Sequence, residues 1–363
     1  MGSHGMEAKV NESVKEFLNF VDNIPDKENV DLRWPLQLMI ANIINENLFG
    51  FKYAYNDCAR LVEYVEGFHK FLTDHSTSYL LLFAVSFSWI RHIPIFGYHA
   101  VWKHRANYLK LHTYIETEVD RCRREFQKDE EATCYVHGYL QRMGNNQMLT
   151  DAQLEACCSD MFAAGQETTT TVLRWAVLFL ADCQDVQEKM RAEIESVVGR
   201  DRLVSISDKP LLPFTSAVVL EVLRRSNVIA RNVMHRTTQD SVIQGKFIPG
   251  NTNIIGDIHR VMAKDSIFED PEAFRPERFL APDGRSFNKD AVDRVVPFSL
   301  GKRQCSGEGL ARVELFLSLA AIVQRYRILP QANGNPVDLE PEYYNIILPK
   351  PQLLRLQLVS SSD

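Results

Sequence analysis

Several features that would indicate other classes of protein are missing from this chain of 363 residues. It has no uninterrupted run of about 18 apolar residues, the length of a membrane-spanning helix, so we predict no transmembrane segment. It also has no excess of basic residues, because 41 Lys and Arg stand against 47 Asp and Glu, for a net charge of −6. We therefore expect no nucleic-acid partner, since general nucleic-acid binding favours a basic surface.

Cysteine is sparse as well. The chain has 7 cysteines, an odd number, and no Cys-x-x-Cys pair. We therefore expect neither a disulfide framework nor a structural zinc site, and a reducing compartment fits better. What is present is ordinary for a globular protein: 45% hydrophobic and 24% charged residues, in a chain long enough for a sizeable core.

The spacing of apolar residues predicts that most of the chain is helical. In the first 44 residues apolar side chains recur every three or four positions, at Val14, Phe17, Leu18, Val21, Leu36, Met39, Ile40, Ile43 and Ile44. Further helices are predicted over residues 151–190, 214–225 and 308–324.

After Asn227 the pattern changes. Polar and apolar residues alternate over 240–247 and 251–255, next to Gly245, Pro249 and Gly250, which is typical of short strands joined by turns. No internal repeat or long linker divides the chain. We expect a mainly α fold with a small β portion, and residues 1–363 as a single domain.

The most informative stretch is Phe298-Ser-Leu-Gly301-Lys-Arg303-Gln-Cys305-Ser-Gly307, directly before the last predicted helix. Backbone N–H groups and the positive end of the helix dipole stabilise a thiolate at such a position. The two glycines let the backbone approach a flat ligand, and Arg303 supplies a cation for an anionic group. Taken alone, an isolated cysteine is more often an inert buried residue.

This stretch resembles the haem-ligand loop of the cytochrome P450 family at its five defining positions, Phe298, Gly301, Arg303, Cys305 and Gly307. The resemblance implies the cytochrome P450 fold, with haem b (iron protoporphyrin IX) as cofactor. It implies Cys305 as the axial ligand of the haem iron and Arg303 as a partner of a haem carboxylate. Phe298, Gly301 and Gly307 would line the cofactor.

Two further motifs are similar to the family's buried structural triad. Glu221-Val-Leu-Arg224 resembles its Glu-x-x-Arg pair, and Arg278 resembles its third member. The i, i+3 spacing places Glu221 and Arg224 on one face of a helix. Without this context such a pair would be read as a solvated surface ion pair. The resemblance implies a triad that holds the core and does no chemistry.

Ala164-Gly165-Gln166-Glu167-Thr168 resembles the oxygen-activation segment of the family's long central helix. The small pair Ala164 and Gly165 would let haem and dioxygen lie against the helix, and Glu167 and Thr168 would relay protons. The alternative is a helix that simply tolerates threonine. His235 stands where microsomal relatives contact a haem propionate, with a structural hydrogen bond as the alternative.

The resemblance covers essentially the whole chain and is closest to microsomal animal members, with stretches that read like nematode ones. It implies a monooxygenase that inserts one oxygen atom from O2 into small lipophilic substrates, such as xenobiotics, fatty or organic acids and sterols. Electrons would come from an NADPH-dependent flavoprotein reductase docking near Lys302 and Arg303. A peroxide-using or isomerising relative would not need Thr168, which argues against that interpretation.

The family's N-terminal anchor and early helices have no counterpart in the sequence, so we expect an N-terminally truncated P450 domain. Met1 would be an internal start or, alternatively, part of a tag remnant. We expect a cytoplasmic location, with peripheral attachment to the cytosolic face of the endoplasmic reticulum through the apolar segment 80–96. The alternative function is a catalytically inactive haem-binding or partner-binding product.

Overall fold

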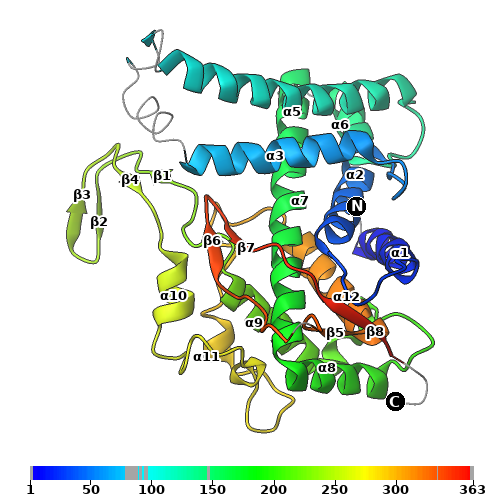
Figure 1. Cartoon of the computed structure of the whole chain (residues 1–363). Helices are drawn as coiled ribbons and strands as arrows, with labels where there is room; N and C mark the ends of the chain where they lie inside the picture. Colours follow the sequence, from blue (N-terminus) through cyan, green and yellow to red (C-terminus); the bar gives the residue numbers. More distant parts are fainter. Residues whose placement is uncertain are drawn as a thin grey trace.

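The computed structural model describes residues 3–77, 89, 92–93, 97–144, 148–332 and 334–359. Most of these residues are helical, as Figure 1 shows. The α-helices are α1 (Ser3–Asp22), α2 (Arg33–Phe49), α3 (Ala59–Thr77), α5 (Gly97–Glu125), α6 (Tyr135–Met143), α7 (Asp151–Asp182), α8 (Gln184–Val197), α9 (Pro213–Ser226), α10 (Ile258–Lys264), α11 (Lys289–Val292) and α12 (Glu308–Arg325). Two short 3-10 helices are η2 (Ile206–Leu211) and η3 (Pro276–Phe279).

The strands of the described residues form antiparallel pairs. The pairs are β1 (His235–Arg236) with β4 (Asn253–Ile254), β2 (Ser241–Ile243) with β3 (Lys246–Ile248), β5 (Tyr326–Leu329) with β8 (Arg355–Leu358), and β6 (Pro341–Tyr343) with β7 (Ile347–Pro349). The β2–β3 hairpin turns at Gln244 and Gly245, whose φ angles of 49° and 76° fit a two-residue turn of type I′. The predicted mainly α fold with a small β portion is confirmed.

Helix α7 passes through the middle of the fold. In Figure 1 it runs from the α3–α5 pair at one end to α8 at the other. Thr150 caps its start, because the Thr150 hydroxyl accepts from Gln153 N (3.3 Å) and the Gln153 side chain accepts from Thr150 N (3.2 Å). Every residue from 171 to 181 is buried. No side of this half of the helix faces solvent, because α2, α9 and α12 all pack against α7.

Two clusters of buried side chains share α7. Its first half contributes Leu154, Cys158 and Phe162 to a cluster with α2, α3, α5 and α6. Its second half, from Val172 to Ala181, belongs to a larger cluster with α1, α9, α12 and β5. Because one helix serves both clusters, it links the two parts of the core.

The predicted helices over 214–225 and 308–324 correspond to α9 and α12. The prediction of one helix over 151–190 is wrong in one respect, because α7 ends at Asp182 and α8 begins at Gln184. Cys183 between them has φ −103° and ψ 74°, outside the helical region. Neither glycine nor proline marks this break, and apolar residues continue across it, so their spacing could not reveal it.

The apolar segment 80–96, which we expected to contact a membrane, lies outside the described residues except for Trp89, His92 and Ile93. Met1 lies outside them too. Among the helices of the described ranges, none combines the length and the apolar character that crossing a bilayer would require.

Candidate functional site

Cys305 lies on the loop that leads into α12. It is a free thiol and is exposed, as are all residues from Leu300 to Gly307. Its backbone N–H donates to Phe298 O (2.9 Å), which closes the loop into a tight turn. Gly301 has a φ of +83°, so the turn favours glycine at this position. The result is an accessible sulfur close to the positive end of the α12 dipole.

Contacts at both ends of the loop hold the Cys305 backbone in place. The Phe298 ring lies 4.9 Å from the Arg312 guanidinium carbon, and Arg312 Nε donates to Glu308 (2.8 Å). A Cβ added at Gly307 would lie 3.8 Å from Cys305 Sγ. The structure therefore places Phe298, Cys305 and Gly307 on one compact loop; their contacts with haem stay a prediction.

Arg303 and His235, the residues expected to meet the haem carboxylates, are both exposed. Within the described chain Arg303 has no ion-pair partner, so its guanidinium is available to an anion. His235 begins β1, and its Nδ1 donates to Val233 O (2.7 Å), which leaves Nε2 for another partner. A contact between Nε2 and a carboxylate requires a proton on Nε2, and therefore the charged imidazolium.

The segment from Ala164 to Thr168 lies in the middle of α7. Thr168 Oγ1 donates to Ala164 O, one turn earlier, at 2.7 Å. Ala164 is exposed and Thr168 is half-buried. Gly165 has a different environment, because an added Cβ would lie 2.9 Å from Ile44 Cδ1 on α2. The structure thus gives Gly165 a role in packing α7 against α2, and its role in admitting haem stays a prediction.

Glu167 is only 3% exposed. Its Oε1 lies 3.4 Å from His69 Nδ1 on α3, and its Oε2 is buried without a hydrogen-bond partner in the described part of the chain. Consecutive residues of a helix point about 100° apart, and no hydrogen bond of the described chain joins Glu167 to Thr168. Sequence analysis missed His69, because it is 98 residues from Glu167 and no local pattern marks it.

A second buried carboxyl group lies beside α7 and was also missed. Glu314 on α12 is 1% exposed, and none of the described residues forms a hydrogen bond with its Oε1. Burial raises the pKa of Glu314 to about 8, against an opposing effect of the Thr169 hydroxyl. Glu314 therefore keeps its proton at neutral pH and needs no counter-ion. The spacing of residues along α12 shows which side of the helix Glu314 lies on, but it does not show that Glu314 is buried.

Glu221, Arg224 and Arg278 come together in a buried cluster. Glu221 accepts from Arg224 Nε (2.7 Å) and Nη2 (2.9 Å), and from Arg278 Nε (3.1 Å). Arg275 N also donates to Glu221 (2.9 Å). The three triad side chains are between 0% and 9% exposed, so this carboxylate has lost its water and is held by charged donors instead.

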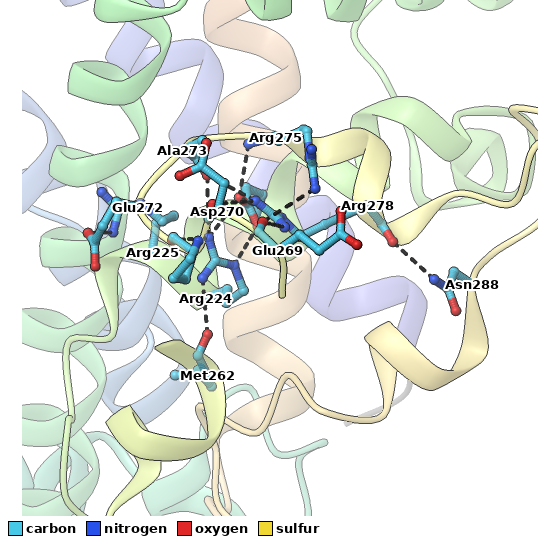
Figure 2. Close-up of polar contacts among 12 residues, drawn as sticks. Arg224, Arg225, Met262, Glu269, Asp270, Glu272, Ala273, Arg275, Arg278 and Asn288 are labelled. Carbon is cyan, nitrogen blue, oxygen red and sulfur yellow. Dashed lines mark hydrogen bonds and ion pairs between the residues drawn. The ribbon is translucent and has the colours of Figure 1, made fainter. Parts of the chain in front are cut away.

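The remaining donors of the two arginines go to backbone carbonyls, as Figure 2 shows. Arg224 donates to Met262 O (3.0 Å) and Pro271 O (2.8 Å), and Arg278 to Glu269 O (2.9 Å). Desolvation lowers the pKa of Arg278, and Glu221 opposes this shift. The cluster thereby ties α9 to the loop that precedes η3, which is a structural role.

The donors present fit a haem. The family's cofactor needs a thiolate for its iron and cations for its carboxylates. Cys305 is an accessible free thiol, and Arg303 is an accessible cation without a partner among the described residues. Within the described residues no hydrogen bond or ion pair joins Cys305, Arg303, His235 and Thr168 to one another. That these four groups face one haem stays a prediction.

Comparison with known proteins identifies relatives. The family described as Cytochrome P450 matches residues 1–356. The chain is 30% identical to cytochrome P450 2E1 of Rattus norvegicus over 350 residues, which is 94% of this chain and 68% of the relative. It is 29% identical to cytochrome P450 1A2 of Homo sapiens over 310 residues, 84% of this chain and 58% of the relative.

A shorter stretch is more similar. Over 199 residues, 55% of the chain, it is 39% identical to cytochrome P450 1A1 of Pleuronectes platessa, and this stretch is 38% of that relative. The chain thus spans between about one third and two thirds of the length of these curated relatives. The family match extends over nearly all of the chain, from the first residue to the last strand. The chain therefore belongs to the cytochrome P450 family.

Proposed function

We propose that the chain is a haem-thiolate monooxygenase that acts on small lipophilic molecules. The observation that carries this proposal is the exposed, free Cys305 on a loop closed by its hydrogen bond to Phe298. Members of the family bind haem b through a cysteine thiolate. When bound, the haem supplies the oxygen chemistry, the insertion of one atom of O2 into the substrate.

The chain's own residues would orient the cofactor and move protons. Cys305 would hold the iron. Arg303 would hold one carboxylate with a guanidinium that has no ion-pair partner among the described residues, and His235 would hold the other through Nε2, as the charged imidazolium. The Thr168 hydroxyl donates to Ala164 O at 2.7 Å. Rotation about its C–O bond would let it donate to a ligand instead. Glu167, whose Oε1 lies 3.4 Å from His69 Nδ1, would take part in the proton relay.

The electron donor and the location are also proposals. Lys302 and Arg303 are exposed next to Cys305, which fits docking of an acidic flavoprotein reductase that uses NADPH. We assign the substrates to xenobiotics, fatty or organic acids and sterols, and the location to the cytosolic face of the endoplasmic reticulum. We also propose that residues 1–363 are one P450 domain, because α7 belongs to both clusters of the core.

The test is the carbon monoxide difference spectrum of the haem-supplemented, dithionite-reduced chain. We expect the red-shifted Soret band of thiolate ligation in the wild type and in Cys183→Ser, a thiol outside the loop. Cys305→Ala should lack it. If the wild type takes up no haem, or shows a band typical of nitrogen ligation, the proposal is wrong and the chain is a catalytically inactive product.

Turnover tests the proton relay. With a reductase and NADPH, Thr168→Ala should still bind haem but should form less product per NADPH consumed. Without the hydroxyl, proton delivery to the oxygen site would be slower. A Thr168→Ser variant keeps the hydroxyl and should retain most of the coupling. Equal coupling in Thr168→Ala and the wild type would remove Thr168 from the relay.

A further inference from the structure

Two cysteines and a histidine lie together where α5 meets α6, away from the Cys305 loop in sequence and element. Cys122 is in the last turn of α5, Cys134 directly precedes α6, and His137 is in the first turn of α6. Cys122 is 0% and Cys134 1% exposed, whereas His137 is half-buried. The two sulfur atoms and one ring nitrogen of His137 all lie within 4.8 Å of one another.

His137 has an unmet bonding capacity. Its Nδ1 lies 3.1 Å from Thr133 Oγ1, whereas its Nε2 is buried and has no hydrogen-bond partner within the described ranges. Buried polar atoms in folded proteins almost always have a partner, so this atom requires an explanation. With the proton on Nδ1 donated to Thr133, Nε2 carries a free lone pair. Metal-binding histidines are held in this way, through a hydrogen bond from the other ring nitrogen.

The surroundings of the two sulfur atoms suit coordination. Cys134 occupies the N-cap of α6, where the positive end of the helix dipole favours negative charge. Arg121 Nη2 donates to Cys122 Sγ (3.6 Å), and the Cys122 thiol donates to Phe49 O (3.3 Å), a proton that it loses when it binds a metal ion. Arg121 Nη2 also donates to Phe49 O (2.8 Å), which fixes the guanidinium beside the sulfur. Positive charge thus lies near both sulfurs and balances the thiolates that a metal ion binds.

We propose that Cys122, Cys134 and His137 bind one zinc ion, with water in the fourth position. Two thiolates and one imidazole are ligands that zinc prefers, in a tetrahedral arrangement. Two sulfurs on one such ion lie about 3.8 Å apart, since each Zn–S bond is about 2.3 Å. A separation of at most 4.8 Å therefore has to shorten by up to about 1 Å between the sulfurs, and slightly more between a sulfur and the nitrogen. The ion would join the end of α5 to the start of α6, independently of haem.

A Cys122–Cys134 disulfide is the competing use of this pair. It would leave His137 Nε2 buried and unpaired, whereas zinc engages all three side chains. The expectation of no zinc site came from the missing Cys-x-x-Cys pair. The ligands here follow another pattern, Cys134-x-x-His137 on one helical turn, completed by Cys122 from a different helix.

The experiment measures zinc bound per chain after dialysis against buffered zinc under reducing conditions. It uses a Cys305→Ala background, because an exposed thiol binds zinc by itself. We expect about one zinc per chain, and a melting temperature that rises with free zinc. The zinc absorption edge should show about two sulfur ligands near 2.3 Å and lighter ligands near 2.0 Å.

Three variants locate the site. Cys122→Ser, Cys134→Ser and His137→Gln should each lower zinc affinity by at least tenfold and abolish the rise in melting temperature. Cys183→Ser, a partly exposed thiol elsewhere, should do neither. Because His137 is half-buried, His137→Gln should fold even if a buried cysteine variant does not. The proposal is overturned if zinc is not retained, if His137→Gln binds zinc like the background, or if mass analysis finds a Cys122–Cys134 disulfide.

Discussion

Glu314 places an ionisable group where water cannot reach it. Burial raises its pKa to about 8 from an ordinary value of 4.5. Between these pH values the folded chain keeps a proton that the unfolded chain has released. The contribution of Glu314 to the free energy of unfolding is therefore largest below pH 4.5, falls as the pH rises to about 8, and is then constant.

Replacement of Glu314 tests this directly. Glu314→Gln removes the titration, so the stability of this variant should fall less between pH 5 and pH 8 than that of the wild type. The difference should reach the order of a few kcal/mol, at up to about 1.4 kcal/mol per pH unit for one proton. Urea unfolding at both pH values measures it, and Glu308→Gln, on the same helix but half-buried, serves as control. Parallel pH profiles for Glu314→Gln and the wild type would refute the assignment.

The contact between His69 and Glu167 is a second test at the scale of residues. His69→Ala leaves both oxygens of a buried carboxylate without a partner, so the free energy of unfolding should fall by about 1–3 kcal/mol. In a Glu167→Gln background, the same change should cost much less. A double-mutant cycle from urea unfolding gives the coupling energy. If the two substitutions have additive effects on the free energy of unfolding, the interaction between His69 and Glu167 contributes nothing to stability.

Among the elements, the packing of α7 on α2 depends on Gly165. Gly165→Ala gains about 0.5–1 kcal/mol of helix propensity, but its Cβ meets Cδ1 of the buried Ile44 at 2.9 Å, and such overpacking costs about 1–3 kcal/mol. The clash is the larger effect, so Gly165→Ala should lower the free energy of unfolding by about 1 kcal/mol.

A companion substitution separates the two effects. Ile44→Val removes the atom at 2.9 Å, and the next closest, Ile44 Cγ1, is at 3.3 Å. In the Ile44→Val background, Gly165→Ala should therefore be neutral or stabilising, as measured by chemical denaturation. Destabilisation of the same size in both backgrounds would mean that Ile44 is not the reason for glycine at this position.

For the whole molecule, the two buried clusters should unfold together, because α7 runs through both. Phe162 and Phe316 are matched probes, 0% and 1% exposed in different clusters. Phe162→Ala and Phe316→Ala should each cost about 3–5 kcal/mol. Hydrogen exchange should show the loss of protection spreading to both clusters in each variant. Loss confined to the cluster that carries the substitution would divide the chain into two units.

Much of the fold follows from local sequence pattern. The spacing of Val14, Phe17, Leu18 and Val21 predicted α1, and all four side chains are buried. Helix spacing is local, since residues three and four apart share a face whatever packs against it. The break at Cys183 was missed for the same reason, because it depends on where α8 must lie against α9 and α12 and not on the residues beside it.

The candidate site divides in a similar way. The Cys305 loop and the Glu221–Arg224 pair are contiguous in the chain, so a motif reveals them. Arg278 is 57 residues from Glu221, and only the family resemblance, not spacing, pointed to it. No motif or family resemblance pointed to His69, and for Glu314 the sequence indicated only its side of the helix. The contact of His69 and the burial of Glu314 depend on how distant helices pack.

By itself, then, the sequence determined the family, the mainly helical fold and the residues of the Cys305 loop. Each of these can be recognised from residues that are close together in the chain. The tertiary structure alone decided that Glu167 faces His69, that Glu314 is cut off from water, and that Cys122 meets Cys134 and His137. These are properties of burial and distance between separate elements. They arise only when packing brings distant side chains together and removes the water between them.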